Sequence, residues 1–180
     1  KELPKYDDIK PTDAEIKGTA DAVKDPVRIE GEDALHKTHQ TLQPTSDASS
    51  YLTSPFHPVL KKYNTIGQGN WKYSGQTITW NVDVPADGYY KINMRVRQNA
   101  LKGFYSTRRI YIDGAVPFQE LNAVRFNYAA QWKNMTLGNG NDAYSIYLKE
   151  GTHYITMENV VGDLTDTMSV LQAVIADLNE

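Results

Sequence analysis

The feature that most constrains the fold is a run of alternating side chains between residues 78 and 97. Every second residue is apolar or aromatic in "ITWNVDV" (78–84) and again in "YKINMRV" (90–96). A period of two is that of a strand with one buried face, and the "PADG" between the two runs has turn chemistry. The sequence therefore predicts two adjacent antiparallel strands, each half buried.

Further strand patterns follow along the chain. The segment "TRRIYIDGAVPF" (107–118) reads as a strand closed by an Asp113-Gly114 hairpin turn. Three more strands are expected in "QWKNMTL" and in "AYSIYLKEGTHYITMENV", with a turn at Glu150-Gly151 between the last two. Short strands separated by turns at this spacing are typical of an all-β antiparallel sandwich.

The two ends of the chain lack this pattern. Residues 1–26 are polar and proline-rich, and they are expected to form an N-terminal arm or linker with a short helix near Thr12–Val23, capped by Thr12. "VRIEGEDAL" (27–35) predicts a strand followed by a turn, and residues 36–70 a long structured loop.

Apolar residues spaced by three and four after residue 165 favour a C-terminal helix over 165–180, with a strand at Val170–Val174 as the alternative. We therefore expect three parts: the arm (1–26), the sandwich (27–164) and a helix leading into a further domain (165–180).

Composition excludes several classes of protein. The 180 residues carry a net charge of −3, so the basic excess of a nucleic-acid-binding domain is missing. There is no cysteine, which excludes disulfides and thiolate metal sites. No apolar run is long enough to span a membrane. Twelve tyrosines favour β structure or an interaction surface.

Four motifs occur in a fixed order: "IEGEDA", "ITWNVDVPADGYYKINMRVRQN", "RRIYIDG" and "IYLKEGTHYITMEN". Together they resemble the carbohydrate-binding modules of families six and thirty-five, over residues 27–160. The resemblance implies a galactose-binding-like jelly roll. It also implies non-catalytic binding of an oligosaccharide or polysaccharide, within a larger bacterial protein that is extracellular or attached to the cell surface.

The resemblance assigns a role to the two glutamates of the first motif. In such modules this pair binds a structural calcium ion, so Glu30 and Glu32 are the candidate metal ligands. Calcium prefers six to eight oxygen ligands, and two adjacent carboxylates supply several. The further acidic ligand of the family has no counterpart, because Gln172 stands where an aspartate is expected. Alternatively, the glutamates are exposed or pair with Arg28 or Lys37.

Sugar binding in such modules depends on aromatic rings in the end loops, with amides that bind hydroxyl groups. A ligand contact and simple packing remain alternatives for each aromatic candidate; for Trp71 the alternative is a plug over the sandwich. Trp80, in phase with the apolar face of its strand, is expected in the core. The candidate sugar-binding residues are Tyr128, Trp132, Trp71, Tyr73 and Asn159.

No nucleophile motif or helical zinc motif supports an enzyme. The alternative function is a structural or protein-docking sandwich of an extracellular solute-binding-type protein that has lost its sugar site. The long arm, the 36–70 segment and the displaced aromatic position near Tyr128 favour this alternative.

Overall fold

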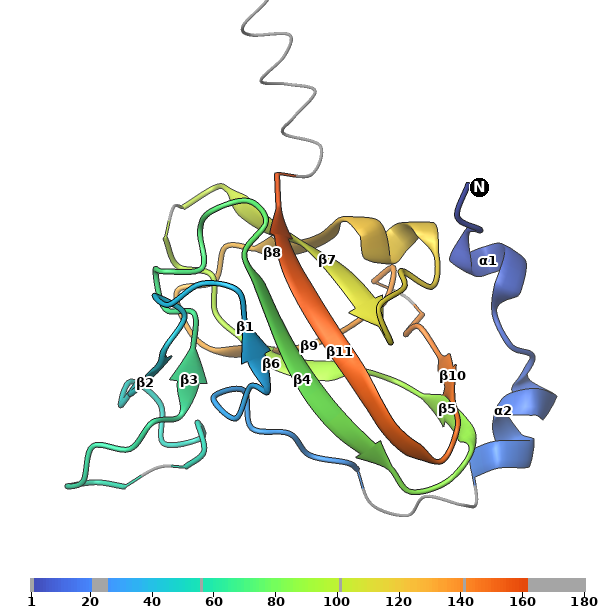
Figure 1. Cartoon of the computed structure of the whole chain (residues 1–180), viewed down its shortest axis with the longest axis horizontal. Helices are drawn as coiled ribbons and strands as arrows, with labels where there is room; N and C mark the ends of the chain where they lie inside the picture. The colour runs from blue at the N-terminus through green and yellow to red at the C-terminus, as the bar shows by residue number, and fades with distance from the viewer. Residues whose placement is uncertain (1, 21–25, 56, 101, 141, 162–180) are drawn as a thin grey trace, which may run out of the picture.

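The computed structural model describes residues 2–20, 26–55, 57–100, 102–140 and 142–161. The fold is an antiparallel β-sandwich, which confirms the predicted all-β class (Figure 1). One layer is a five-stranded sheet in the order β1-β4-β11-β7-β8. Its strands are β1 (His36–Lys37), β4 (Thr77–Val84), β11 (Gly151–Val160), β7 (Tyr105–Ile112) and β8 (Val124–Asn127).

Two strand pairs lie behind this sheet and form the second layer (Figure 1). The core between the layers is apolar and includes Val82 and Ile110 from the sheet and Ile146 and Leu148 from the pairs. Trp80 is half-buried against this core rather than fully inside it. The pairs are β5 (Gly88–Tyr90) with β10 (Ile146–Leu148), and β6 (Asn93–Val96) with β9 (Lys133–Thr136).

The predicted hairpin between residues 78–84 and 90–96 is wrong in its pairing. Both segments contain strands, but β4 pairs with β1 and β11, whereas β5 and β6 pair in the other layer. The turn after β4 carries the chain across the sandwich. Each of the two runs has one apolar face. Because the runs lie in opposite layers, both apolar faces point into the same core. Alternation therefore predicts the strands but does not choose their partners.

The predicted strand in residues 27–35 is also wrong. Only its turn is present, at Gly31–Glu32, where the Asp33 amide donates to the Glu30 carbonyl at 3.1 Å. Only the last residue of this segment bonds to β4: the Leu35 amide donates to the Thr79 carbonyl at 2.8 Å, and the pairing continues in β1. The indole of Trp80 donates to the Gly31 carbonyl at 2.8 Å, so a side chain rather than a strand ladder holds the turn to the sheet.

The Asp113-Gly114 turn is confirmed. Both residues have positive φ, 50° and 81°, as a two-residue hairpin turn of type I′ requires. The chain then makes a single bridge, between Ile112 and Ala115, and continues into the 3₁₀ helix η1 (Gln119–Asn122) instead of a full return strand.

Two short helices, α1 (Tyr6–Ile9) and α2 (Asp13–Ala20), lie along one side of the sandwich (Figure 1). Thr12 caps α2 as predicted: its hydroxyl accepts from the Glu15 amide at 3.3 Å, and the Glu15 carboxylate accepts from the Thr12 amide at 2.7 Å. Tyr6 belongs to the core, a contact that the sequence did not indicate.

The long 36–70 segment contains β2 (Pro44–Thr45) and β3 (Thr65–Ile66), which pair with each other and project from the side opposite the helices (Figure 1). The predicted C-terminal helix (165–180) lies outside the described residues. Within the described part of the chain, no helix has the length and apolar character needed to cross a membrane.

Candidate functional site

A hollow of about 220 Å³ opens at one end of the sandwich, where a glycine-rich loop (67–75) meets the start of β7 and the end of β11. Lysine, serine, threonine, tyrosine, asparagine and valine residues line it, and none of the described residues that line it is acidic. The main lining residues are Lys72, Ser74, Tyr105, Ser106, Thr107 and Asn159.

Local sequence explains the shape of the glycine-rich loop. Gly67 has φ of 97°, and a Cβ at this position would lie 3.3 Å from the ring of Trp71, so glycine permits the ring to fold back against the loop. The buried Gln76 side chain accepts from the amides of Lys72 and Tyr73, both at 2.9 Å. The Trp71 indole donates to the Gln76 carbonyl at 3.1 Å.

Arg108 contacts Asn159, one of the residues that line the hollow. It is in phase with Ile110 and Ile112 on β7, so its side chain points into the sandwich, and burial lowers the pKa of its guanidinium to about 10. The guanidinium stacks over Trp71 at 4.4 Å from the ring centroid and donates to the Asn159 Oδ1 at 2.5 Å. Trp71 and Asn159 are thereby fixed to each other.

Three of the five predicted sugar-binding residues therefore gather at this end of the molecule. Trp71 packs against the core as the plug that the sequence allowed, with the Arg108 guanidinium over its ring. Tyr73 is 57% exposed beside Lys72, whose Nζ lies 5.4 Å from the tyrosine ring centroid. Asn159 is buried and lines the hollow. A role of these residues in sugar binding remains a prediction.

Trp132 and Tyr128 do not line this hollow. The Arg97 guanidinium lies over the Trp132 ring, 4.9 Å from its centroid, and Arg97 forms an ion pair with the buried Asp47. Burial favours a higher pKa for Asp47, but hydrogen bonds from Ser49, the charge of Arg97 and the Trp132 indole together lower it. Tyr128 is half-buried after β8.

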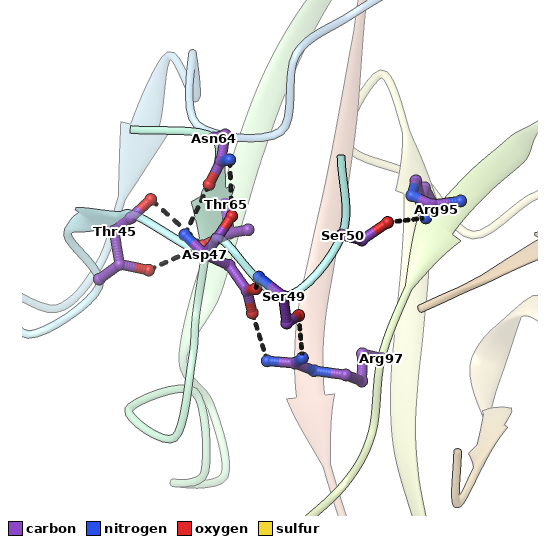
Figure 2. A network of polar contacts seen from close by, with 8 residues as sticks. All are labelled: Thr45, Asp47, Ser49, Ser50, Asn64, Thr65, Arg95 and Arg97. Atoms are coloured by element: carbon purple, nitrogen blue, oxygen red, sulfur yellow. Dashed lines mark hydrogen bonds and ion pairs between the residues drawn. The ribbon is translucent and has the colours of Figure 1, made fainter. Parts of the chain in front are cut away.

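A clamp of hydrogen bonds and one ion pair holds the segment 46–64 against β6 and Arg97, the residue that follows β6 (Figure 2). The Asn64 side chain accepts from the Asp47 amide at 2.8 Å and donates to the Asp47 carbonyl at 2.9 Å. Arg97 donates to the Ser49 hydroxyl at 2.9 Å and Arg95 to the Ser50 hydroxyl at 3.0 Å. These contacts fix the base of the segment and cover the surface around Trp132.

Of the two predicted calcium ligands, Glu30 comes directly before the Gly31–Glu32 turn and Glu32 is part of it. Arg28 pairs with Glu30 at 2.9 Å, as the alternative for this residue expected. Burial raises the pKa of Glu32, and a hydrogen bond from its own backbone lowers it. The charges of Glu30 and Asp33 raise this pKa further. In the described ranges, no three or more histidine or acidic side chains form a metal-binding group.

The sequence did not single out Thr107, Lys72 or Ser74, which line the hollow because distant loops converge there. The phase of Arg108 with Ile110 and Ile112 is the signal that indicates its burial.

Comparison with known proteins finds carbohydrate-active enzymes. No protein-family model matches the chain. Over 132 residues the chain is 30% identical to a 3-O-alpha-D-galactosyl-alpha-L-arabinofuranosidase of Bifidobacterium longum subsp. longum. That match covers 66% of this chain but only 11% of the enzyme. The chain thus corresponds to a small part of its relative.

Solved structures support the sandwich fold. A cycloisomaltooligosaccharide glucanotransferase of Paenibacillus sp., complexed with cycloisomaltoheptaose, matches with a TM-score of 0.52 and 22% identity, over 87% of this chain and 17% of that chain. A family 35 carbohydrate-binding module from Clostridium thermocellum also matches, with a TM-score of 0.42 and 18% identity, over 52% of this chain and 65% of the module.

Proposed function

We propose that this chain binds carbohydrate without acting on it, and that the hollow at the end of the sandwich is the binding site. The observation that carries this proposal is the convergence of an aromatic ring, a fixed amide and hydroxyl groups at one opening. Tyr105, Asn159 and Ser74 provide them from three separate segments.

The chemistry of the hollow suits a sugar. A pyranose has a face of C–H groups that stacks on an aromatic ring, and its hydroxyls bind amide and hydroxyl groups. Tyr105 is the stacking ring in this proposal, with Tyr73 at the rim, and Asn159 and Ser74 bind hydroxyls. Because a single small hollow buries little area, weak affinity is expected.

The similarity to carbohydrate-active proteins supports binding to a glycan. The contacts of three carboxylates support a non-catalytic role. Asp47 pairs with Arg97, Asp113 with His153, and Glu158 accepts from Arg109 and Tyr111. These groups are engaged in structural contacts rather than directed at the hollow.

Titration with a panel of oligosaccharides, followed by calorimetry, tests the proposal. We expect saturable binding to at least one glycan and a loss of at least tenfold in affinity for Tyr105→Ala. Tyr154→Ala is the matched control, because Tyr154 is exposed on the outer face of β11, away from the hollow. The absence of binding to every glycan, or equal affinity of the two variants, would contradict it.

Protein docking is a second candidate function, favoured by the exposed tip of segment 46–64. Large apolar side chains are exposed there although the base of the segment is clamped, and such a patch is typical of an interaction surface. A tip that contacts another domain of the parent polypeptide would fit this candidate. The exposed residues are Tyr51, Leu52, Val59, Leu60 and Tyr63.

We also propose that Glu30 and Glu32 bind a calcium ion that stiffens the sandwich. Glu30, Glu32 and Asp33 lie within four residues, and a cation would offset both the burial of Glu32 and the repulsion by its two neighbours, which raise its pKa. Two carboxylates supply at most about four of six to eight oxygens, so backbone carbonyls must contribute. Thermal unfolding should shift to higher temperature with calcium and return with a chelator. An unchanged melting temperature, or the same calcium shift in Glu32→Gln, argues against it.

We further propose an extracellular or cell-surface location in a bacterium, with other domains of the same polypeptide as partners. The low coverage of the matched glycosidase supports a multidomain parent. The parent sequence tests this: an export signal and a carbohydrate-active or solute-binding domain are expected. A parent without either would contradict it.

A further inference from the structure

A second hollow, of about 280 Å³, opens within segment 46–64, on the side of the sandwich opposite α1 and α2 (Figure 1). Its walls are largely apolar, and two of the apolar side chains, Val59 and Leu60, are 85% and 59% exposed. A hollow bordered by exposed apolar side chains is typical of a surface that receives an apolar side chain of a partner. The apolar lining residues are Ala48, Pro55, Pro58, Val59 and Leu60.

The charge available at this hollow is positive. Lys61 and Lys62 line it, and both are exposed. Segment 46–64 contains one acidic residue, Asp47, which is already paired with Arg97. The two lysines therefore have no carboxylate from their own segment, although the net charge of the chain is −3. We call Tyr51, Leu52 and residues 59–62 the tip patch. A partner that is both apolar and acidic complements it.

The sequence of residues 165–180 has this chemistry. It contains three acidic residues, Asp166, Asp177 and Glu180, and no lysine, arginine or histidine. Seven of the ten residues between Asp166 and Asp177 are apolar. These residues lie outside the described part of the structure. Their sequence is an apolar run bracketed by carboxylates, whereas the tip patch is an apolar hollow bordered by lysines.

The length of the chain after β11 allows these two parts to meet. Val161 lies with Lys72 and Ser74 at the first hollow, in contact with the loop that directly follows β3. β3 pairs with β2, and the two strands form the base of segment 46–64. Nineteen residues follow Val161. Fully extended they span about 60 Å, whereas a compact chain of this length has a radius of gyration of about 16 Å.

We propose that the tip patch is the docking site of residues 165–180 of the same chain. Apolar side chains of residues 168–175 fill the second hollow beside Leu60, and the carboxylates on either side of them face Lys61 and Lys62. This inference does not depend on the carbohydrate site. It names an occupant for the second candidate function, protein docking.

A spin label tests the proposal on the intact chain. Because the chain has no cysteine, Asn179→Cys provides a single attachment site for a nitroxide. We expect the label to broaden the amide signals of residues 51–52 and 59–62 at least threefold more than those of the outer face of the five-stranded sheet. The broadening should decrease in 0.5 M salt, because the charges are screened.

Two variants of the tip patch should reduce this broadening at least threefold. Leu60→Ser removes an apolar contact, and the double variant Lys61→Gln/Lys62→Gln removes the positive charge; all three side chains are exposed, so the fold should be unaffected. Leu35→Ser and Lys149→Gln are the matched controls, since both residues are exposed and neither lies in the tip patch. The controls should leave the broadening unchanged.

Three outcomes would overturn the inference. Uniform broadening, or equal broadening in the patch variants and the wild type, would show that the segment does not dock there. Broadening of unlabelled chains mixed with labelled ones would assign the patch to a second copy. No broadening of the patch would leave protein docking to be tested with another domain. None of these results bears on the oligosaccharide titration, which reports on the first hollow.

Discussion

His153 is held between two hydrogen-bond acceptors, and this determines its charge. Its Nδ1 lies 2.6 Å from the Asp113 carboxylate and its Nε2 lies 2.8 Å from the Lys149 carbonyl. An ionised carboxylate and a carbonyl only accept hydrogen bonds, so both ring nitrogens must carry protons. The hydrogen bonds to Asp113 and Lys149 therefore raise the pKa of His153 above its ordinary value of 6.5.

This contact gives the protein a pH-dependent stability. A raised pKa in the folded state stabilises the fold fully below pH 6.5, and that contribution is lost as the pH rises through the higher pKa of the folded protein. Urea unfolding between pH 5.5 and 9 should show wild-type stability falling towards high pH. His153→Gln should reduce this dependence. An equal slope in both proteins would show that His153 has no part in it.

At the scale of elements, segment 46–64 is attached to the residue after β6 by the ion pair of the buried Asp47 with the half-buried Arg97. Removing one partner of a buried pair leaves the other charge uncompensated. Asp47→Asn should therefore lower the free energy of unfolding by about 3 kcal/mol. The measurement is urea unfolding, together with proteolysis of the released segment.

The exposed pair of Arg28 and Glu30 provides the control for this prediction. Since exposed ion pairs contribute little, Arg28→Gln should cost less than about 1 kcal/mol. Similar costs for the two variants would mean that the clamp on segment 46–64 is not a stabilising contact.

Strands could be predicted from the sequence more reliably than their partners. Alternation locates β4 and β11, and Asp113-Gly114 fixes a turn, because these signals are local. Pairing is not local: Tyr90 lies opposite Ile146, far along the chain. Nor did the sequence indicate that Val27 and Ile29 would be exposed outside a strand. The conformation of this region depends on packing and on the hydrogen bond from the Trp80 indole.

At the scale of the whole molecule, α1 is part of the sandwich core. The Tyr6 ring packs against Tyr144 at 4.6 Å and Phe118 at 5.0 Å between ring centroids. Its hydroxyl accepts from the buried Ser145 amide at 2.8 Å. A segment that reads as a polar arm thus contributes one of the buried aromatic side chains.

Tyr6→Ala should lower the free energy of unfolding by about 3 to 4 kcal/mol, because it leaves a cavity between two aromatic rings. Tyr6→Phe keeps the ring but leaves the Ser145 amide without its acceptor, so it should cost about 1 to 2 kcal/mol. Urea unfolding measures both. A cost near zero for Tyr6→Ala would show that α1 is not docked on the core in solution.

The candidate site could be predicted only in part, because the residues that form it are far apart in the sequence. Trp71, Tyr73 and Asn159 could be chosen by residue type, and the fold brings them together. Thr107 and Arg108 could not, because their importance comes from burial at the place where three segments meet.

The central claim is that the hollow at the end of the sandwich binds carbohydrate. Chemical-shift mapping of backbone amides during titration with an oligosaccharide tests it most directly. The account predicts saturable shifts concentrated at residues 72–74, 105–107 and 159–161. Shifts centred on segment 46–64 or on the outer face of the five-stranded sheet, or no shifts with any glycan, would contradict it.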